Sequence, residues 1–300
     1  MMGFAILAVF ILCAIYAQMR GMVQYEAVRR RFTDYANFFA PINCLFYAFS
    51  KQKNTPYIDV AHFPELNVLQ ENWQMIRDEA INLNQATHIK ASADLDDLGF
   101  NSFFRTGWKR FYLKWYGANL KSAEQLCPKT LALLQQLPSV KGAMFAMLPP
   151  GAYLGKHRDP YAGSLRYHLG LVTPNSDDCY ISVDGQKYSW RDGEAVIFDE
   201  TYIHYAKNQT EQNRIILFLD VKRPVNFFLV DWFNEIFSRI VVAASATKNV
   251  EGDKVGFLNH VFRYVHMAGK QGKKIKAYNR RLYYFLQYVI YAGLIYWIFF

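Results

Sequence analysis

The sequence contains little cysteine, and its cysteines follow no metal-binding or disulfide pattern. Cys13, Cys44, Cys127 and Cys179 are the four in the chain, and no two have CxxC spacing. This excludes a zinc ribbon and a thioredoxin-like redox motif. Scattered thiols of this kind are typical of buried residues in a reducing compartment. Internal repeats and low-complexity tracts are also missing, which excludes a repeat architecture.

The sequence between the two ends also lacks a basic stripe interleaved with aromatics, the pattern of a nucleic-acid surface. The formal net charge is nonetheless +9. Part of this charge flanks two apolar runs, in Arg20 and Arg29 to Arg31 after the first run and in basic residues within 270–281 before the second. Attraction to anionic lipid headgroups explains these positions more simply. We therefore expect a membrane partner and no nucleic-acid partner.

Both ends of the chain have apolar runs close to the length of a membrane span, which is about 20 residues. Residues 3–17 form an uninterrupted run, and residues 282–300 form a second one with several tyrosines and Trp297. The first run lacks the positive n-region and the cleavage site of a signal peptide, so we expect an uncleaved anchor. The positive-inside rule then places the middle of the chain in the cytoplasm.

These patterns divide the chain into five parts. We expect an N-terminal membrane anchor at 1–19, a juxtamembrane segment at 20–59, a β-rich domain at 60–223, an amphipathic helix with a basic juxtamembrane segment at 224–281, and a C-terminal anchor at 282–300. The aromatic residues of the juxtamembrane segment 20–59 suit either the bilayer surface or packing against the β-rich domain. Residues 224–246, at the start of the part 224–281, are mostly apolar and suit an interfacial, a buried or a membrane-spanning helix.

The central domain changes from helical to strand-like sequence at about Val140. Apolar residues recur at helical spacing over 64–85 and 125–137. Asp184-Gly185 between two short apolar runs predicts a hairpin turn. The strand-like runs, separated by turn sequences, are 142–148, 164–172, 179–183, 186–189, 195–198 and 214–221. This spacing predicts a mainly β fold, a small barrel or jelly roll with flanking helices.

Two histidines and a carboxylate are the candidate metal ligands. His157 and Asp159 are two residues apart, so in an extended strand their side chains point the same way. His204 lies in strand-like sequence 47 residues after His157 and reaches them only if the sheet closes. Two imidazoles and one carboxylate leave three positions of a metal open. That suits Fe(II), which must hold a bidentate co-substrate and O2 together.

Arginines in the apolar strands suggest the co-substrate. Arg214 follows the last candidate ligand, and its planar fork suits the far carboxylate of 2-oxoglutarate. Arg166 and His168 share one face of their strand, where polar side chains need partners. A bound dicarboxylate would supply one. A surface salt bridge for Arg166 and an ordinary core position for His168 are the alternatives.

Two sequence strings resemble the aspartyl/asparaginyl β-hydroxylase family of Fe(II)/2-oxoglutarate dioxygenases. They are Arg166-Tyr167-His168-Leu169-Gly170-Leu171 and the segment from Gly193-Glu194 through Phe198-Asp199 to His204. The resemblance covers about residues 60–223 and implies a double-stranded β-helix (jelly roll). It also implies that His157 and His204 bind iron, that Arg214 binds 2-oxoglutarate, and that Arg166 and His168 lie near the co-substrate and O2.

Asp159 and the two apolar ends make this chain similar to the bacterial lipid A hydroxylases of the family, since the animal protein hydroxylases lack this carboxylate. The resemblance implies hydroxylation of a lipid A acyl chain at the cytoplasmic face of the bacterial inner membrane, with conversion of 2-oxoglutarate to succinate and CO2. Lipid A carries phosphates, so we expect a basic rim, formed by Lys156, Arg158, Lys109 and Arg110. A membrane-bound peptidyl Asp/Asn β-hydroxylase and a metal-binding barrel without oxygenase activity are the alternatives.

Overall fold

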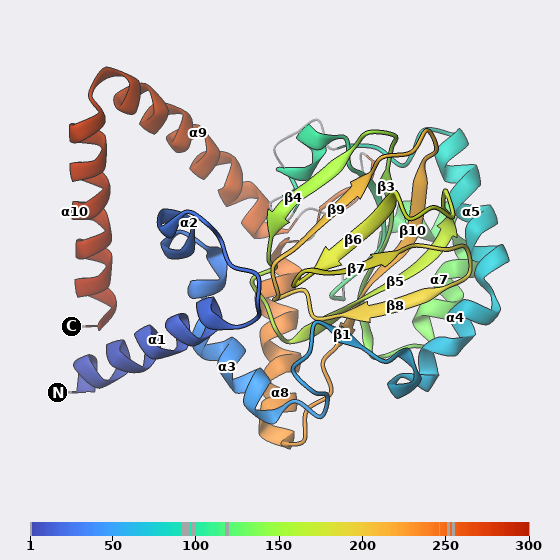
Figure 1. Cartoon of the computed structure of the whole chain (residues 1–300), viewed down its shortest axis with the longest axis horizontal. Helices are drawn as coiled ribbons and strands as arrows, with labels where there is room; N and C mark the ends of the chain where they lie inside the picture. The colour runs from blue at the N-terminus through green and yellow to red at the C-terminus, as the bar shows by residue number, and fades with distance from the viewer. Residues whose placement is uncertain are drawn as a thin grey trace.

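The computed structural model describes residues 2–91, 97, 100–117, 120–245, 247–250, 253 and 256–299. Two antiparallel β-sheets form the centre of the molecule, and helices surround them (Figure 1). This is a mainly β, jelly-roll-like arrangement with flanking helices, as the strand spacing predicts.

The larger sheet has six strands in the order β1-β8-β5-β10-β3-β2. Its central strands are buried along nearly their whole length, because helices cover one face and the smaller sheet covers the other. The strands are β1 (Tyr57–Ile58), β2 (Lys109–Trp115), β3 (Val140–Leu148), β5 (Ser164–Val172), β8 (Ala195–Phe198) and β10 (Arg214–Lys222).

The smaller sheet has four strands in the order β4-β9-β6-β7. They are β4 (Tyr153–His157), β6 (Cys179–Val183), β7 (Gln186–Ser189) and β9 (His204–Asn208). The turn between β6 and β7 is the predicted hairpin, and both Asp184 and Gly185 have positive φ, at 50° and 85°. Positive φ at both central residues is the geometry that favours Asp-Gly in a two-residue hairpin.

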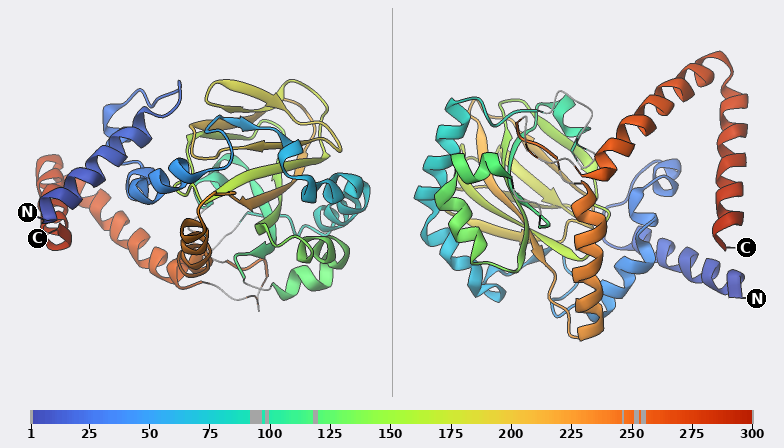
Figure 2. Two further views of the ribbon diagram at one scale, coloured as in Figure 1. Left: turned by 90° about the horizontal axis from the view of Figure 1, so that it is seen from below. Right: turned by 180° about the vertical axis from the view of Figure 1, so that it is seen from behind.

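The predicted helices in 64–85 and 125–137 are each divided in two. Asn72 separates the first pair because its side-chain amide donates to Val68 O at 2.8 Å. Pro128 starts the second helix of the other pair, since proline disfavours helical geometry at the residue before it. These helices lie together on one side of the sheets (Figure 2). Their bounds are α4 (Asn67–Glu71), α5 (Trp73–Gln85), α6 (Lys121–Leu126) and α7 (Pro128–Gln135).

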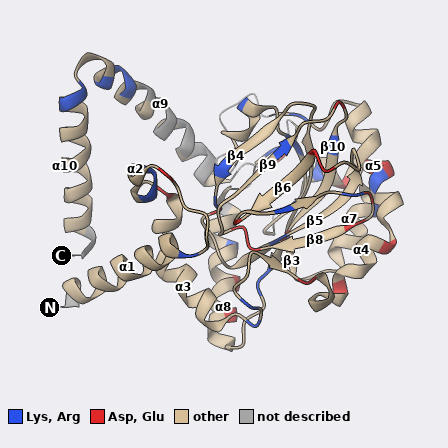
Figure 3. Ribbon diagram, in the orientation of Figure 1, with Lys and Arg blue, Asp and Glu red and all other residues tan. Residues whose placement is uncertain are grey.

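The remaining helices lie on the opposite side of the sheets, where both ends of the chain are found (Figures 1 and 2). They are α1 (Met2–Met19), α2 (Val28–Phe32), α3 (Ala40–Phe49), α8 (Phe228–Phe237), α9 (Phe257–Tyr278) and α10 (Arg280–Phe299). Short 3-10 turns occur at Tyr35–Asn37, Val60–His62, Pro64–Leu66, Phe103–Thr106 and Ala243–Ser245, and a π-helical turn follows α8 at Ser238–Val242. Lys and Arg gather on α2 and near the bend between α9 and α10 (Figure 3).

A second, smaller apolar cluster joins α3 and α8 to the sheets. Phe46 and Tyr47 of α3 are buried in it with Tyr161 and Val225. This part of segment 20–59 therefore packs against the domain, one of the two positions that its aromatic residues suit. Phe38, in contrast, is 72% exposed. In the described residues, no helix combines the length and apolar content that crossing a membrane requires, so the anchors predicted at 1–19 and 282–300 are not confirmed.

Candidate metal centre

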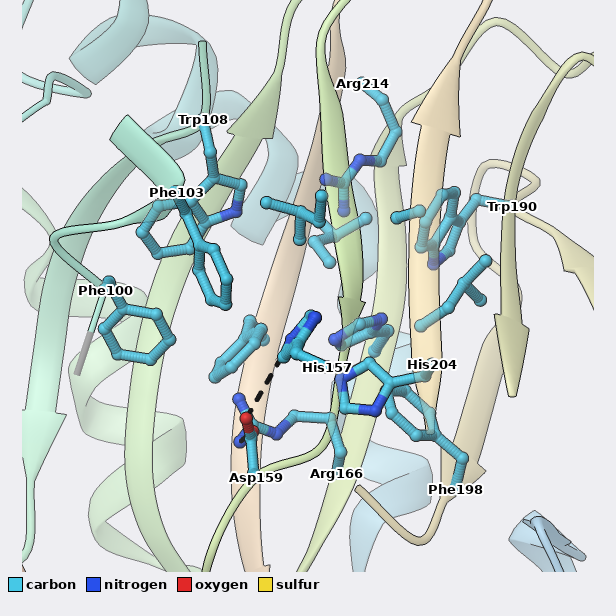
Figure 4. Close-up of a pocket in the computed structure, with 16 residues that line it drawn as sticks. Phe100, Phe103, Trp108, His157, Asp159, Arg166, Trp190, Phe198, His204 and Arg214 are labelled. Atoms are coloured by element: carbon cyan, nitrogen blue, oxygen red, sulfur yellow. Dashed lines mark hydrogen bonds and ion pairs between the residues drawn. The ribbon is translucent and has the colours of Figure 1, made fainter. Parts of the chain in front are cut away.

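The two predicted histidine ligands face each other across neighbouring strands. His157, the last residue of β4, is paired in register with His204, the first residue of β9. Their ring centroids are 4.2 Å apart. One ligand atom from each histidine and one from Asp159 all lie within 4.8 Å of one another. The structure therefore brings the three candidate ligands together (Figure 4).

Both imidazoles are oriented for metal binding through Nε2. The Nδ1 of His157 donates to Gly155 O at 2.7 Å, and that of His204 donates to Tyr202 O at 2.9 Å. Such bonds select the tautomer that leaves Nε2 free as a ligand. Burial lowers the pKa of His157. Burial and the neighbouring His157 ring lower the pKa of His204 to about 3. Both rings are therefore neutral at physiological pH, the form that binds metals.

Asp159 reaches the site from a loop, and the prediction that it shares a strand with His157 is wrong. β4 ends at His157, and the Asp159 backbone N–H instead donates to Glu200 O at 2.9 Å. The carboxylate is only partly buried and remains beside the two rings. Two neutral imidazoles and one carboxylate on one side of a small space are the ligand set of non-haem Fe(II) oxygenases. These residues fit a divalent iron ion.

Arg166 is surrounded by carboxylates. Its guanidinium forms ion pairs with Asp159 at 2.8 Å, with Asp220 at 3.2 Å and with Glu200. The side chain is almost fully buried and lies over the Phe218 ring. Arg166 thus contacts a candidate metal ligand directly, and its charge is already balanced within the protein. The sequence suggested a co-substrate role or a surface salt bridge, and the ion pairs found are buried.

Arg214 and His168, in contrast, are buried with polar atoms that have no partner among the described residues. Arg214 is 2% exposed, its Nε has no hydrogen-bond partner, and no described carboxylate lies within ion-pair distance of it. Burial lowers the pKa of Arg214 to about 10, so it remains charged at neutral pH. Both ring nitrogens of His168 also lack partners. Buried polar groups are rarely left unsatisfied, so this pair indicates a site for a polar ligand, and the carboxylate of 2-oxoglutarate fits it.

Aromatic and aliphatic side chains complete the walls of the same pocket (Figure 4). The Phe103 ring lies 4.6 Å from the His157 ring, and Trp190 stacks under the Arg214 guanidinium at 4.3 Å. No sequence pattern distinguished these two aromatics from core residues. The apolar lining consists of Phe100, Phe103, Trp108, Leu154, Ile181, Trp190, Phe198, Ala206, Ile216 and Phe218.

The predicted basic rim is only partly available to a substrate. Arg158 is 7% exposed and paired with Asp34, and Arg110 is 2% exposed and paired with Asp97 at 2.9 Å. These two arginines are buried in ion pairs, so the expectation that they bind substrate phosphates is wrong. Lys109 is half-buried, and Lys156 keeps an exposed ammonium group, 3.9 Å from a carboxylate oxygen of Glu26.

Comparison with known proteins identifies a family over half of the chain. Residues 70–224 match the model of the aspartyl/asparaginyl beta-hydroxylase family. This range contains the three candidate metal ligands, Arg166 and Arg214.

Individual relatives act on different substrates, according to their names. The ornithine lipid ester-linked acyl 2-hydroxylase of Rhizobium tropici is 36% identical over 59% of this chain and 64% of its own length. The human aspartyl/asparaginyl beta-hydroxylase is 30% identical over 52% of this chain and 21% of its own length. This chain therefore spans less than two thirds of either relative. A Pseudomonas putida prolyl-4-hydroxylase structure is similar over 52% of this chain and 88% of its own, with 17% identity and a TM-score of 0.33.

Proposed function

The chain belongs to the aspartyl/asparaginyl beta-hydroxylase family, and we propose that it hydroxylates an acyl chain of a membrane lipid, using Fe(II), 2-oxoglutarate and O2. The observation that carries this proposal is the distribution of charge in the pocket. Of the described residues that line it, the Lys and Arg residues are Arg166 and Arg214. Arg166 is balanced by three carboxylates, which leaves only Arg214 for an anionic ligand.

A peptidyl aspartate substrate would bring a second carboxylate into the pocket beside that of 2-oxoglutarate. Burying a carboxylate without a partner costs several kcal/mol, and the pocket offers no second unpaired cation among its described lining residues. An acyl chain requires no such partner. Its methylene groups suit walls built of phenylalanine, tryptophan and leucine, since each buried CH2 contributes about 0.8 kcal/mol. The lining therefore favours a lipid over the peptide alternative.

The roles of the pocket residues follow from their positions. His157, Asp159 and His204 would hold Fe(II), and Arg214 would bind the far carboxylate of 2-oxoglutarate through its fork. When bound there, iron and 2-oxoglutarate supply oxidation of a C–H bond by O2, with release of succinate and CO2. Arg166 orients Asp159 through their ion pair. The aromatic wall at Phe100, Phe103 and Trp108 keeps water away from the reacting C–H bond.

For the lipid itself, we propose lipid A at the cytoplasmic face of a bacterial inner membrane. Support comes from exposed apolar side chains on α1 and α8, among them Phe4 and Trp232 at 68% and 63% exposure, and from the three arginines of α2. Such surfaces suit contact with an anionic leaflet. An ornithine lipid is the second candidate, and the specific observation favouring it is the activity that the name of the R. tropici relative gives.

Mass spectrometry of lipids from Gram-negative cells that make both lipids would test the proposal. Cells expressing the chain are compared with cells expressing His157→Ala, and lipid A and ornithine lipid are analysed separately. We expect one class to gain a single oxygen atom only with the intact triad. Unchanged lipids in cells that hold folded protein would contradict the proposal. Succinate release stimulated by Asp/Asn peptides would then support the peptide alternative, and no succinate release would support a metal-binding barrel without oxygenase activity.

A further inference from the structure

A segment distant in sequence from the metal centre lies against both loops that carry it. This segment, residues 17–34, runs from the end of α1 through α2 and is called the strap below. The first loop follows β4 and, together with the end of that strand, comprises residues 156–159, which carry two of the candidate ligands. The second, residues 199–204, ends at the third. The strap makes side-chain or backbone contacts with each loop, across more than a hundred residues of sequence.

The contact with the first loop is through Arg158, which lies between the two ligands of that loop. Its guanidinium donates to Ala17 O at 2.5 Å and forms an ion pair with Asp34 at 3.1 Å. Both side chains are almost fully buried, at 2% and 5% exposure. A further strap residue, Arg30, donates to Lys156 O. The two ends of the strap therefore converge on one arginine beside the metal centre.

The contact with the second loop is through Arg20. Its guanidinium pairs with Asp199 at 2.6 Å, donates to Thr201 Oγ1 at 2.5 Å and lies over the Tyr202 ring at 3.9 Å. The Asp199 side chain is fully buried. Tyr202 is also the residue whose carbonyl accepts from the Nδ1 of His204. The strap therefore contacts the residue that orients the third ligand.

Hydrogen bonds through Asp184 also join the strap to the second loop. The N–H groups of Met22 and Val23 both donate to Asp184 Oδ1 at 2.7 Å, and the Asp184 N–H donates to Ile203 O at 2.9 Å. Gly21 makes this approach possible, since its φ is +88° and a Cβ there would lie 2.7 Å from the same carboxylate oxygen. Only glycine fits this position without strain.

The strap is joined to the two loops mainly by ion pairs and charge-assisted hydrogen bonds, which indicates that it holds the loops in position. Burying two arginines carries a large desolvation cost, and apolar residues of similar size often stabilise a protein as well or better. Directional charge-assisted bonds, unlike apolar packing, hold two segments in one relative position. Residues that contact metal ligands from outside tune metal affinity by orienting those ligands.

We propose that Arg20 and Asp34 are positioning residues, through which the strap holds the two ligand-bearing loops at metal-binding geometry. The inference rests on the metal site of the proposed function. It adds that metal affinity depends on a segment that supplies none of the three candidate ligands. It also means that a displacement of α1, which leads directly into the strap, would shift the loops that carry the metal ligands.

Cobalt(II) binding to the full chain tests this inference without turnover. Co(II) alone is titrated and followed by its visible absorption, which reports ligand geometry, and the melting temperature of each variant is measured in parallel. Asp34→Asn removes the charge that pairs with Arg158 but keeps a residue that can cap the turn at Ala36. Arg20→Gln removes the charge that pairs with Asp199.

We expect each variant to bind Co(II) about 10–100-fold more weakly than the unaltered protein and with a changed spectrum. Asp34→Glu, which keeps the charge, should recover part of the affinity. The matched control is Asp177→Asn, which breaks an exposed ion pair with Arg191 away from the triad. It should leave Co(II) affinity and spectrum unchanged.

Unchanged Co(II) affinity and spectrum in both strap variants would overturn the inference, even if their melting temperatures fall. A wrong lipid substrate would leave these Co(II) results unchanged, whereas a wrong assignment of the metal site gives a different pattern. In that case the unaltered chain would fail to bind Co(II), or would bind it as well as His157→Ala does, and the metal site and the inference would fall together.

Discussion

Arg214 is a buried charge with no ion-pair partner among the described residues, and its proposed partner is the co-substrate. Arg214→Ala should raise the KM for 2-oxoglutarate by at least about 30-fold, because removing one partner of a buried charge pair costs about 2–5 kcal/mol. Succinate formation measured against 2-oxoglutarate concentration checks this. Arg214→Lys keeps the charge without the planar fork and should give an intermediate KM. An unchanged KM in both variants would remove Arg214 from the co-substrate site.

Arg166 differs from Arg214 because it balances three carboxylates. Arg166→Met should lower the free energy of unfolding by about 3–5 kcal/mol at neutral pH, since it leaves buried charges uncompensated. Urea unfolding of the variant and the unaltered chain measures this difference. The KM for 2-oxoglutarate should change less than in Arg214→Ala. A raised KM with unchanged unfolding would instead return Arg166 to the co-substrate role that the sequence suggested.

At the scale of single elements, β5 carries Arg166 and His168 and is packed closely against the segment after β7. A Cβ added at Gly170 would lie 2.0 Å from the backbone oxygen of Arg191. Gly170→Ala should therefore destabilise the protein by about 1–3 kcal/mol, the usual cost of overpacking, as measured by urea unfolding. Gly155→Ala in β4 is the control, because nothing lies within 4 Å of its added Cβ. Equal stability of the two variants would contradict this account of β5.

Element prediction succeeded where the hydrophobic pattern is regular and failed where it is not. The six strand-like runs all correspond to strands. Five of them bury their apolar residues in the centre of the molecule, whereas the half-exposed β7 follows the Asp184-Gly185 turn. Strands were expected at His157 and at His204, but β4 and β9 were predicted without bounds, and β1 and β2 were not predicted. β4 is mostly exposed, and β9 reads His-Tyr-Ala-Lys-Asn, so neither alternates apolar with polar residues. Their pairing, which brings His157 to His204, is visible only in the folded chain.

At the scale of the whole molecule, Asp199 links three distant parts of the chain. Although burial opposes its ionisation, the guanidinium groups of Arg223 and Arg20 hold the pKa of Asp199 well below its ordinary value of 3.8. A carboxylate with a depressed folded-state pKa contributes stability that is present above its unfolded pKa and is lost as pH falls through its folded pKa. The ion pairs of Asp199 should therefore stabilise the fold above about pH 4.

Asp199→Asn should lower the free energy of unfolding by about 3–5 kcal/mol at neutral pH. The difference from the unaltered chain should shrink as the pH falls below about 4, because the unaltered chain then loses the same contribution. Denaturant unfolding at several pH values between 7 and 3 measures this. A difference that stays constant over that range would mean that the Asp199 charge contributes nothing to the effect.

By itself, the sequence determined the strands with regular apolar patterns, the Asp184-Gly185 turn and the ligand types at His157, Asp159 and His204, because these depend on local periodicity and on side-chain chemistry. Only the tertiary structure decided which buried arginine is paired with carboxylates of the protein and which is left for a ligand. Arg214 and Arg166 look alike in sequence, as buried arginines in apolar strands. Their difference arises from Glu200 and Asp220, which folding places beside Arg166 alone. Charge balance depends on neighbours in space, and the order of residues along the chain does not specify those neighbours.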